Sequence, residues 1–317
     1  MSAAIDVRGL RKSYGPKSVL DGIDLTVAEG TIFSLLGPNG AGKTTAVQIL
    51  STLIAADAGE IRVAGYDLHR DPENVRAAIG VTGQFSAVDG LMTGRENLIL
   101  MADLYHLGKQ EGRRRADELL EQFELADAGK KLAMTYSGGM KRRLDLAMTL
   151  VGRPRIIFLD EPTTGLDPRS RHSMWAMIRD LVAGGVTVFL TTQYLDEADE
   201  LANRIAVLDH GRLVAEGTAE ELKRLVPGGH VRLRFTSPEE FTLAGQVLPT
   251  AVPNSEALVL QVPSDGSVHA LRDLLARIDD ASLAVSELTV HTPDLDDVFF
   301  AVTGQPTAAQ HEEVMTK

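Results

Sequence analysis

Three short motifs follow one another along this chain, and their order limits what it can fold into. A glycine-rich loop occupies residues 37–44, a Ser-Gly-Gly turn lies at residues 137–139, and an apolar run at residues 156–159 ends in Asp160 and Glu161. A glycine-rich loop between a strand and a helix indicates a nucleotide-binding protein. The turn between that loop and the carboxylates then indicates which kind of nucleotide-driven protein this is.

Length and composition exclude several classes of protein. The 317 residues allow one large domain or two unequal ones. Cysteine is absent, which excludes disulfides and thiolate metal sites and fits a reducing compartment. A net charge of −12 is unfavourable for binding nucleic acid, so we expect no nucleic-acid partner. We also expect neither a secretory signal nor a membrane span, since no apolar run approaches about 18 residues.

Short apolar strands alternate with helices over much of the chain. This order predicts an α/β fold with a mixed, mainly parallel sheet covered by helices on both faces. The first 30 residues are typical of short strands around turns at Gly15-Pro16 and Asp21-Gly22. Beyond them the expected strands are 31–36, 79–82, 156–159, 186–191 and 205–208, and the expected helices are 43–53, 169–183 and 195–202.

The pattern predicts two domains and a tail. We expect a nucleotide-binding domain over residues 1–226, with a helical subdomain at about 86–150. Pro227-Gly228-Gly229 then breaks the alternation. Residues 227–304 are predicted to form a small accessory α+β domain, with strands at 231–235, 257–262 and 285–291 and a helix at 268–278. Residues 305–317 read as a flexible polar tail.

The glycine-rich loop has the residues that a polyphosphate requires. Glycines allow the backbone to approach the phosphates closely, and the amides of residues 40–45 would surround the β-phosphate at a helix N-terminus. Lys43 would reach the β- and γ-phosphate oxygens, and the Thr44 hydroxyl would bind Mg²⁺. A chance glycine-rich turn is a poor alternative, because a strand precedes it and a helix follows. The expected nucleotide contacts here are Gly37, Asn39, Gly40, Ala41, Gly42, Lys43, Thr44 and Thr45.

Two carboxylates follow the apolar run at 156–159. They would lie at the carboxyl edge of a parallel sheet, where such sheets bind ligands. Asp160 would hold Mg²⁺, and Glu161 would polarise the attacking water as general base. Gln84, after the apolar strand at 79–82, is a candidate contact to Mg²⁺ and water, although a lone glutamine is more often only a surface residue.

The ordered set of motifs resembles the ATP-binding subunits of ABC transporters, over about residues 5–225. The resemblance places an adenine-stacking aromatic at Tyr14, the Q-loop at Gln84 and the D-loop at Leu166-Asp167. It places the signature at Ser137, Gly138 and Gly139. It implies a P-loop NTPase fold of the ABC cassette type and ATP and Mg²⁺ as cofactors. It also implies a homodimer in which the Ser-Gly-Gly turn of one copy caps the γ-phosphate held by the other.

The chain departs from that family pattern in two places near the site. Gln193 stands where the family usually has a switch histidine. An amide can donate a hydrogen bond to the γ-phosphate, but it cannot become cationic or shuttle a proton. We therefore expect hydrolysis to rely mainly on Glu161, with Lys43 and Gln193 also in catalytic roles. Tyr136 and Met140 flank the signature glycines where leucine and glutamine are commoner, and we expect function to survive.

Three further segments resemble the daunorubicin/doxorubicin-resistance type of drug-export ATPase. They are residues 93–98, residues 191–199 and the Leu-Asp-Asp-Val-Phe element at 295–299. The resemblance implies a separate membrane permease of the ABC-2 drug-export type and a place on the cytoplasmic face of the cell membrane. Two alternatives stay open. Residues 295–302 are either a packing helix or a subunit contact, and the apolar residues of 85–105 either dock the permease or belong to the core.

Other functions remain to be weighed. A soluble ABC-type ATPase that acts on ribosomes or DNA usually has two cassettes or a long coiled coil and basic surfaces, which this acidic single cassette lacks. A monomeric P-loop kinase or GTPase would leave the Ser-Gly-Gly turn and Asp167 without a role. Import stays open, and the cargo (a hydrophobic drug, another natural product or a lipid) is not specified by these residues.

Overall fold

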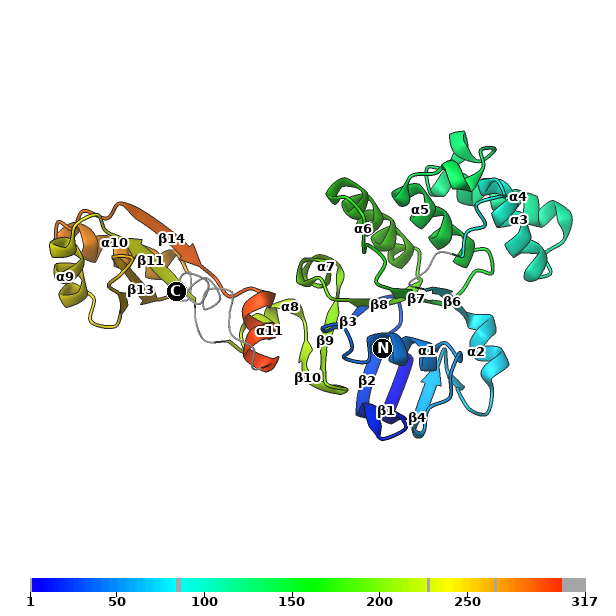
Figure 1. Cartoon of the computed structure of the whole chain (residues 1–317), viewed down its shortest axis with the longest axis horizontal. Coiled ribbons are helices and arrows are strands. Elements are labelled where there is room, and N and C mark those ends of the chain that lie inside the picture. The colour runs from blue at the N-terminus through cyan, green and yellow to red at the C-terminus, as the bar shows by residue number, and fades with distance from the viewer. Residues whose placement is uncertain (1, 84–86, 227–228, 265–266, 304–317) are drawn as a thin grey trace. The chain divides into compact units, whose positions relative to one another are not determined.

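The computed structural model describes residues 2–83, 87–226, 229–264 and 267–303 (Figure 1). It divides into two compact units, Met1–Ala219 and Glu220–Lys317. The domain boundary expected from the sequence was residue 226, a few residues later. The polar tail at 305–317 lies outside the described residues.

The first unit is built on a six-stranded sheet with the order β10-β9-β3-β8-β7-β6. All neighbours from β9 to β6 pair in parallel, and β10 joins β9 as an antiparallel edge strand. This confirms the mainly parallel sheet predicted from the apolar runs. Its strands are β3 (Ile32–Leu36), β6 (Ile79–Thr82), β7 (Ile156–Asp160), β8 (Thr187–Thr192), β9 (Arg204–Asp209) and β10 (Arg212–Gly217).

The central strands are buried on both faces, and their alternate side chains enter two different cores. In β7, Ile156 and Phe158 pack in a core with α1 (Lys43–Leu50), whereas Ile157 and Leu159 pack in a second core with the helices of the opposite face. In Figure 1, α5 and α6 lie on one side of this sheet and α1 on the other. An uninterrupted apolar run is what such two-sided burial requires.

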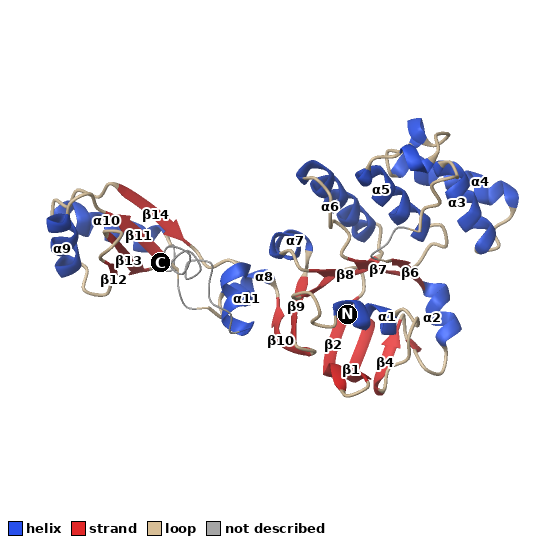
Figure 2. Cartoon of the chain, viewed as in Figure 1, coloured by secondary structure: helices blue, strands red, loops and turns tan. Residues whose placement is uncertain are grey.

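The N-terminal segment forms a second, antiparallel sheet with the order β2-β1-β4-β5. Figure 2 shows its strands β1, β2 and β4 on the α1 side of the main sheet. The turn expected at Asp21-Gly22 is wrong, because β2 continues through these residues. Gly22 instead has φ 74° at an irregularity in the pairing, where a glycine can sit inside a strand. The strands are β1 (Ala3–Tyr14), β2 (Lys17–Ala28), β4 (Ala58–Val63) and β5 (Tyr66–Asp67).

Helices complete the first unit. The segment expected to be helical at about 86–150 contains three α-helices from residue 94 on, whereas its described residues 87–93 form no helix. Thr93 and Glu96 form a reciprocal capping box at the start of α3. Two short 3-10 turns, Ala126–Ala128 and Ala133–Thr135, precede the signature helix α5. The α-helices are α2 (Pro72–Ala78), α3 (Gly94–Leu104), α4 (Lys109–Gln122), α5 (Gly138–Thr149), α6 (Pro168–Ala183) and α7 (Leu195–Leu201).

Tyr136, which precedes the signature, fixes the start of α5 to the rest of the helical region. Its side chain is buried, and its hydroxyl donates a 2.7 Å hydrogen bond to the Ala128 carbonyl. Gly94 leaves room for that hydroxyl, since a Cβ at position 94 would overlap Tyr136 Oη. The uncommon tyrosine is therefore matched to a glycine more than 40 residues away in the sequence.

The second unit is a small α+β domain, as predicted. Its antiparallel sheet has the order β12-β13-β11-β14, and its core includes Val231, Leu233, Leu260 and Leu274. The sequence analysis did not identify α9 or β12. The elements are α8 (Ala219–Lys223), β11 (His230–Arg234), α9 (Pro238–Val247), β12 (Val252–Asn254), β13 (Val259–Pro263), α10 (Val268–Asp280), β14 (Glu287–His291) and α11 (Leu295–Thr303).

The Leu-Asp-Asp-Val-Phe element opens α11, and part of it has a local structural role. Asp297 accepts a hydrogen bond from the Asp294 amide at 3.1 Å, and its own amide donates to Asp294 Oδ1 at 3.0 Å. Asp297 Oδ2 also lies 2.9 Å from His291 Nε2 at the end of β14. The packing-helix alternative therefore accounts for Asp297, while Phe299 and Phe300 stay half-exposed.

We expect Gly94→Ala to destabilise the first unit by about 1–3 kcal/mol, because the added methyl group overlaps Tyr136 Oη and a packed core cannot absorb it. Urea unfolding followed by circular dichroism would measure the change. The same substitution should cost less in a Tyr136→Phe background, where the clashing oxygen is gone. Additive costs in that double variant would show that Tyr136 is not the group that Gly94 accommodates.

Candidate functional site

The glycine-rich loop joins β3 to α1, and its three glycines serve different needs. A Cβ at Gly37 would overlap the Leu208 carbonyl oxygen of β9, and one at Gly42 would lie 2.8 Å from the Val19 carbonyl oxygen. Packing of the loop against its neighbours therefore requires glycine at both positions. Gly40 has φ 81° with no atom near its Cβ position, so its conformation alone favours glycine.

This loop forms one wall of a cavity of about 580 Å³. Eight of the residues predicted from the sequence line it, including Glu161 and Gln193 from the ends of two other strands. Three lining residues, Lys17, Val19 and Thr164, were missed, because nothing in their local sequence indicates a ligand. The lining residues are Lys17, Val19, Asn39, Gly40, Gly42, Lys43, Thr44, Thr45, Glu161, Thr164 and Gln193.

Lys43 is held inside the loop. Its ammonium group donates hydrogen bonds to the carbonyls of Gly37 at 2.7 Å and Pro38 at 3.1 Å, and lies 3.5 Å from Glu161 Oε1. Only 4% of the side chain is exposed. Burial lowers the pKa of Lys43, and the carboxylates of Glu161 and Asp160 oppose that shift. The cation is thus positioned at the cavity before any anion enters.

Asp160 is the last residue of β7, and its carboxylate is almost fully buried. Thr191 Oγ1 of the neighbouring strand β8 donates to Asp160 Oδ1 at 2.5 Å, and Thr44 Oγ1 lies 3.5 Å from the same oxygen. The Thr44 hydroxyl and the Asp160 carboxylate are hard oxygen donors of the kind that Mg²⁺ prefers. Gln84, the third predicted metal contact, lies outside the described residues.

Glu161 has an unusual backbone. Its φ is 50°, a left-handed conformation that is costly for a residue with a side chain. Its amide donates to the Thr191 carbonyl at 3.1 Å and to Thr191 Oγ1 at 3.2 Å. On the side chain, Oε2 accepts from the Thr164 hydroxyl at 3.3 Å while Oε1 faces Lys43. These contacts fix a carboxylate in the cavity where sequence reasoning placed the general base.

The signature residues are not among those that line this cavity in the described chain. Ser137 is the N-cap of α5, where its hydroxyl accepts from the Met140 amide at 3.3 Å. Ser137 and Gly138 are exposed, while a Cβ at Gly139 would lie 2.8 Å from Ser170 Oγ of α6. The turn therefore presents its polar groups to solvent rather than to the glycine loop of its own chain.

Asp167 and Tyr14 also lie outside the set that lines the described cavity. Asp167 is the N-cap of α6, where the hydroxyl and amide of Ser170 donate to it and lower its pKa. Tyr14 ends β1, is 51% exposed and lies under Lys12 Nζ, 5.5 Å from the ring centroid. It pairs across the hairpin with Lys17, which does line the cavity.

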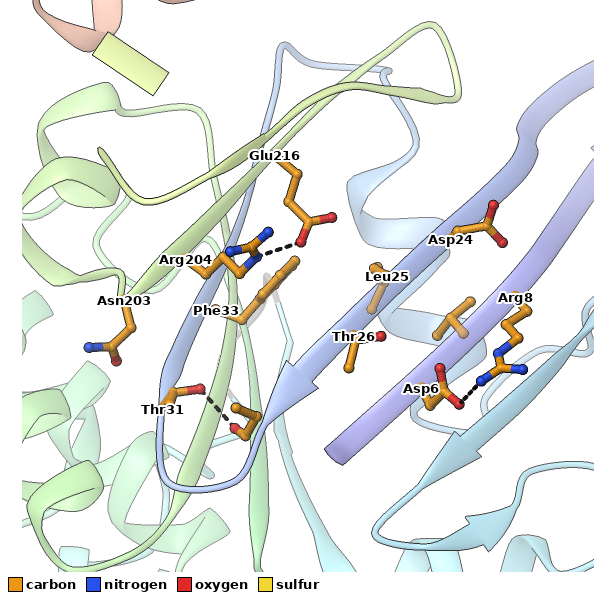
Figure 3. Close-up of a pocket in the computed structure, with 12 residues that line it drawn as sticks. Asp6, Arg8, Asp24, Leu25, Thr26, Thr31, Phe33, Asn203, Arg204 and Glu216 are labelled. Carbon is orange, nitrogen blue, oxygen red and sulfur yellow. Dashed lines mark hydrogen bonds and ion pairs between the residues drawn. The ribbon is translucent and has the colours of Figure 1, made fainter. Parts of the chain in front are cut away.

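A second cavity of about 770 Å³ lies near the start of β3, at the end opposite the glycine loop (Figure 3). Four of its charged groups form two ion pairs, and a backbone amide binds the fifth. Arg204 Nε lies 2.6 Å from Glu216 Oε1, and Arg8 lies 3.3 Å from Asp6. The Asp24 carboxylate accepts from the Gly9 amide at 2.6 Å. With these charges paired, we assign it no role in nucleotide chemistry.

Comparison with known proteins gives the family that the glycine loop and the strand-end carboxylates indicate. The ABC transporter family profile matches residues 20–164. The chain is 49% identical over 309 residues to daunorubicin resistance ATP-binding protein DrrA2 of Streptomyces coeruleorubidus, covering 96% of both chains. It is 45% identical to daunorubicin/doxorubicin resistance ATP-binding protein DrrA of Streptomyces peucetius, covering 98% of both. Nod factor export ATP-binding protein I of Paraburkholderia xenovorans is 39% identical, with 96% of this chain and 98% of the relative covered.

Solved structures show the same architecture. An ATP-binding subunit of an ABC transporter is 29% identical, with a TM-score of 0.63 over 70% of this chain and 92% of that one. An ATP-binding cassette in its ADP conformation, 24% identical, has a TM-score of 0.64 over 70% and 93% of the two chains and supports the fold alone.

The described helices include none with the length and apolar character needed to cross a bilayer. Similarity over almost the whole length of the curated relatives, together with the glycine loop, the strand-end carboxylates and the cassette fold, settles the family. The chain belongs to the ABC transporter family, as one of its ATP-binding and ATP-hydrolysing proteins.

Proposed function

We propose that this chain is the ATP-hydrolysing subunit of an ABC exporter that moves a hydrophobic drug, natural product or lipid through a separate membrane permease. The near full-length identity to daunorubicin and doxorubicin resistance ATP-binding proteins carries this proposal. The similarity to Nod factor export proteins supports export more broadly and leaves the cargo class wide. The chemistry of the cavity then assigns roles to individual residues.

Nucleotide binding follows from the charges and donors of the glycine loop. Lys43 supplies the cation for the β- and γ-phosphates, and the amides at the start of α1 supply hydrogen-bond donors. Tyr14 would stack on the adenine. The other residues that would form the loop around the phosphates are Gly37, Asn39, Gly40, Ala41, Gly42 and Thr45. Mg²⁺ would be held by Thr44, Asp160 and Gln84, and when bound it would neutralise phosphate charge.

We assign the role of general base in ATP hydrolysis to Glu161. Its carboxylate faces the cavity, and Lys43 lies 3.5 Å from it. A triphosphate would compete for that ammonium group, which would leave Glu161 to accept a proton from the attacking water. Gln193, on the same cavity, would donate its amide to the γ-phosphate without taking part in proton transfer.

We further propose that two copies of the chain pair with two ATP molecules between them. Ser137 and Gly138 face solvent, and Gly139 is half-buried beside them, at the N-terminus of α5, where a helix offers amide donors to an anion. Since they do not line their own described cavity, the phosphate they would cap is the one bound by a second copy. Asp167 lies beside them at the N-terminus of α6 and would form part of the same interface.

The permease would be of the ABC-2 drug-export type, with this chain bound at the cytoplasmic face of the cell membrane. Within the segment 87–105, the structure separates core from surface. Leu98 is fully buried, whereas Leu91 is 80% and Leu100 39% exposed. Leu104 is also exposed, at 64%, and these three exposed leucines are therefore candidates for permease contact. The names of the relatives cited above, which refer to drug resistance and Nod factor export, favour transport over the alternative function of an ABC-type ATPase acting on a macromolecular complex.

ATP-driven transport should depend on Lys43. Inverted membrane vesicles that contain this chain and its permease should accumulate daunorubicin, used as the probe cargo, when ATP is supplied. We expect Lys43→Ala to abolish the uptake, because it removes the main phosphate cation from the cavity. Lys109→Ala is the control, since Lys109 is exposed at the start of α4 and should leave uptake unchanged. Normal uptake by the Lys43 variant would contradict the site.

Glu161→Gln should trap the ATP-bound pair. Loss of the general base is expected to slow hydrolysis by about 100-fold or more while ATP binding persists. Light scattering after gel filtration should then show a mass near 68 kDa with ATP, twice the 34.2 kDa of one chain, and one chain's mass without it. A variant that binds ATP and stays at the mass of one chain would argue for a protein that acts as a monomer.

Gln193→His should leave ATP hydrolysis unchanged or raise it. The substitution restores a side chain that can carry a proton at the edge of a cavity that already holds Glu161. Steady-state phosphate release at saturating ATP would measure the effect. Complete loss of activity, with ATP still bound, would mean that the glutamine amide has a role that histidine cannot fill.

A further inference from the structure

The signature helix α5 contains a buried ion pair with no role in the site described so far. Arg142 Nη1 lies 3.3 Å from Asp145 Oδ2, and the two side chains are only 13% and 4% exposed. Burying two charges is costly unless their remaining hydrogen-bonding groups are satisfied. The partners that satisfy them are therefore informative about what the pair does.

Arg142 binds main-chain carbonyls at the exits of two neighbouring strands. Nε donates to the Pro162 carbonyl at 2.8 Å, and Nη2 donates to the carbonyls of Asp160 at 3.2 Å and Glu161 at 3.3 Å. Nη1 donates to the Gly83 carbonyl at 3.1 Å, just after β6. A planar guanidinium with five N–H donors suits such a cluster of acceptors, which the three donors of a lysine could not reproduce.

Asp145, the partner of Arg142, also binds a main-chain group from another part of the chain. Its Oδ1 accepts from the Ala87 amide at 3.0 Å, while its Oδ2 faces Arg142. The pair therefore binds the residues on either side of the segment that contains Gln84. One turn of α5 is thus connected to the end of β6, to the turn after β7 and to residue 87.

The contact at Glu161 matters most, because that residue has a positive φ. Thr191 holds its amide and Arg142 holds its carbonyl, so both peptide groups of the strained residue are fixed by other elements. Strained conformations persist where the surrounding structure determines them. The Thr164 amide also donates to the Glu161 carbonyl at 3.3 Å, so without Arg142 this carbonyl keeps only that partner among those described, and the Glu161 carboxylate is held less firmly.

We propose that Arg142, fixed by Asp145, is a positioning residue for hydrolysis: it aims Glu161 and ties that turn to the helix that carries the Ser-Gly-Gly signature. The inference rests on the proposed role of Glu161 as general base. Arg142 would affect the rate of the chemical step rather than the affinity for nucleotide. The reason is that Arg142 binds the backbone carbonyls of Asp160 and Glu161 and is not among the residues that line the described cavity.

The experiment compares ATP affinity, kcat and thermal unfolding in matched variants. Arg142→Met/Asp145→Asn removes both charges together, so neither is left buried beside a missing partner, and Arg142→Lys keeps the charge without the fork. We expect the dissociation constant for ATP, measured by calorimetry, to change by less than about threefold. We expect kcat to fall by about 10- to 100-fold in the double variant, because misplacing a catalytic group costs rate, and by less with lysine.

Arg115→Met is the control for lost stability. Arg115 is 17% exposed and donates to the Leu150 carbonyl at 2.8 Å, at the opposite end of α5. This substitution should lower the unfolding temperature and leave kcat within about twofold of the wild-type value. Wild-type kcat in the folded double variant, or losses that match those of Arg115→Met at equal unfolding temperature, would overturn the proposal. Glu161→Gln, run in parallel, tests the underlying function: if it retains hydrolysis, the general-base assignment itself fails.

Discussion

The buried contact between the Lys43 ammonium and the Glu161 carboxylate organises the site. A lysine that is almost fully buried needs compensation for its charge, and here two loop carbonyls and one carboxylate supply it. Another anion could replace the Glu161 carboxylate as the partner of Lys43. The γ-phosphate of a nucleotide carries more charge than Glu161 and would take over the lysine. Binding would then also free Glu161, the proposed general base, so this one contact would connect nucleotide binding to hydrolysis.

The sheet makes this contact possible. The glycine loop follows β3, Asp160 ends β7, and Thr191 and Gln193 come from the end of β8, which lies between them in the sheet. Parallel pairing brings all three carboxyl ends to one edge. Rigid support comes from strands that are apolar on both faces, because each enters two separate cores. The polar groups at this edge are then held by hydrogen bonds between neighbouring strands, such as the one that Thr191 Oγ1 donates to Asp160 Oδ1.

Much of this arrangement could be predicted, because it depends on local patterns. Apolar runs bounded by glycines or carboxylates identified β3, β6, β7 and β8, and the mainly parallel pairing followed from the alternation with helices, whereas the strand order comes from the structure alone. The expected turn at Asp21-Gly22 was wrong because a glycine in a strand and a glycine in a turn look alike in one sequence. Arg142 was missed because its partners, the carbonyls of Gly83, Asp160 and Pro162, are distant in the chain, so no spacing records the contact. Lys17 and Thr164 were missed because nothing in their local sequence indicates a ligand. Gln84 lies outside the described residues, and its role stays a prediction.

The position of Ser137 bears on the proposed pairing of two copies. As an N-cap, its oxygen accepts a hydrogen bond from the Met140 amide, which uses a lone pair and leaves the hydroxyl hydrogen available to donate. That hydrogen and the amides of the first helical turn form a set of donors at the N-terminus of α5. The cavity beside Lys43 has the reverse character once a triphosphate enters it, with phosphate oxygens facing outward. Each copy of the chain would therefore carry one half of a complete anion site. Two copies related by a twofold axis would complete both halves at once.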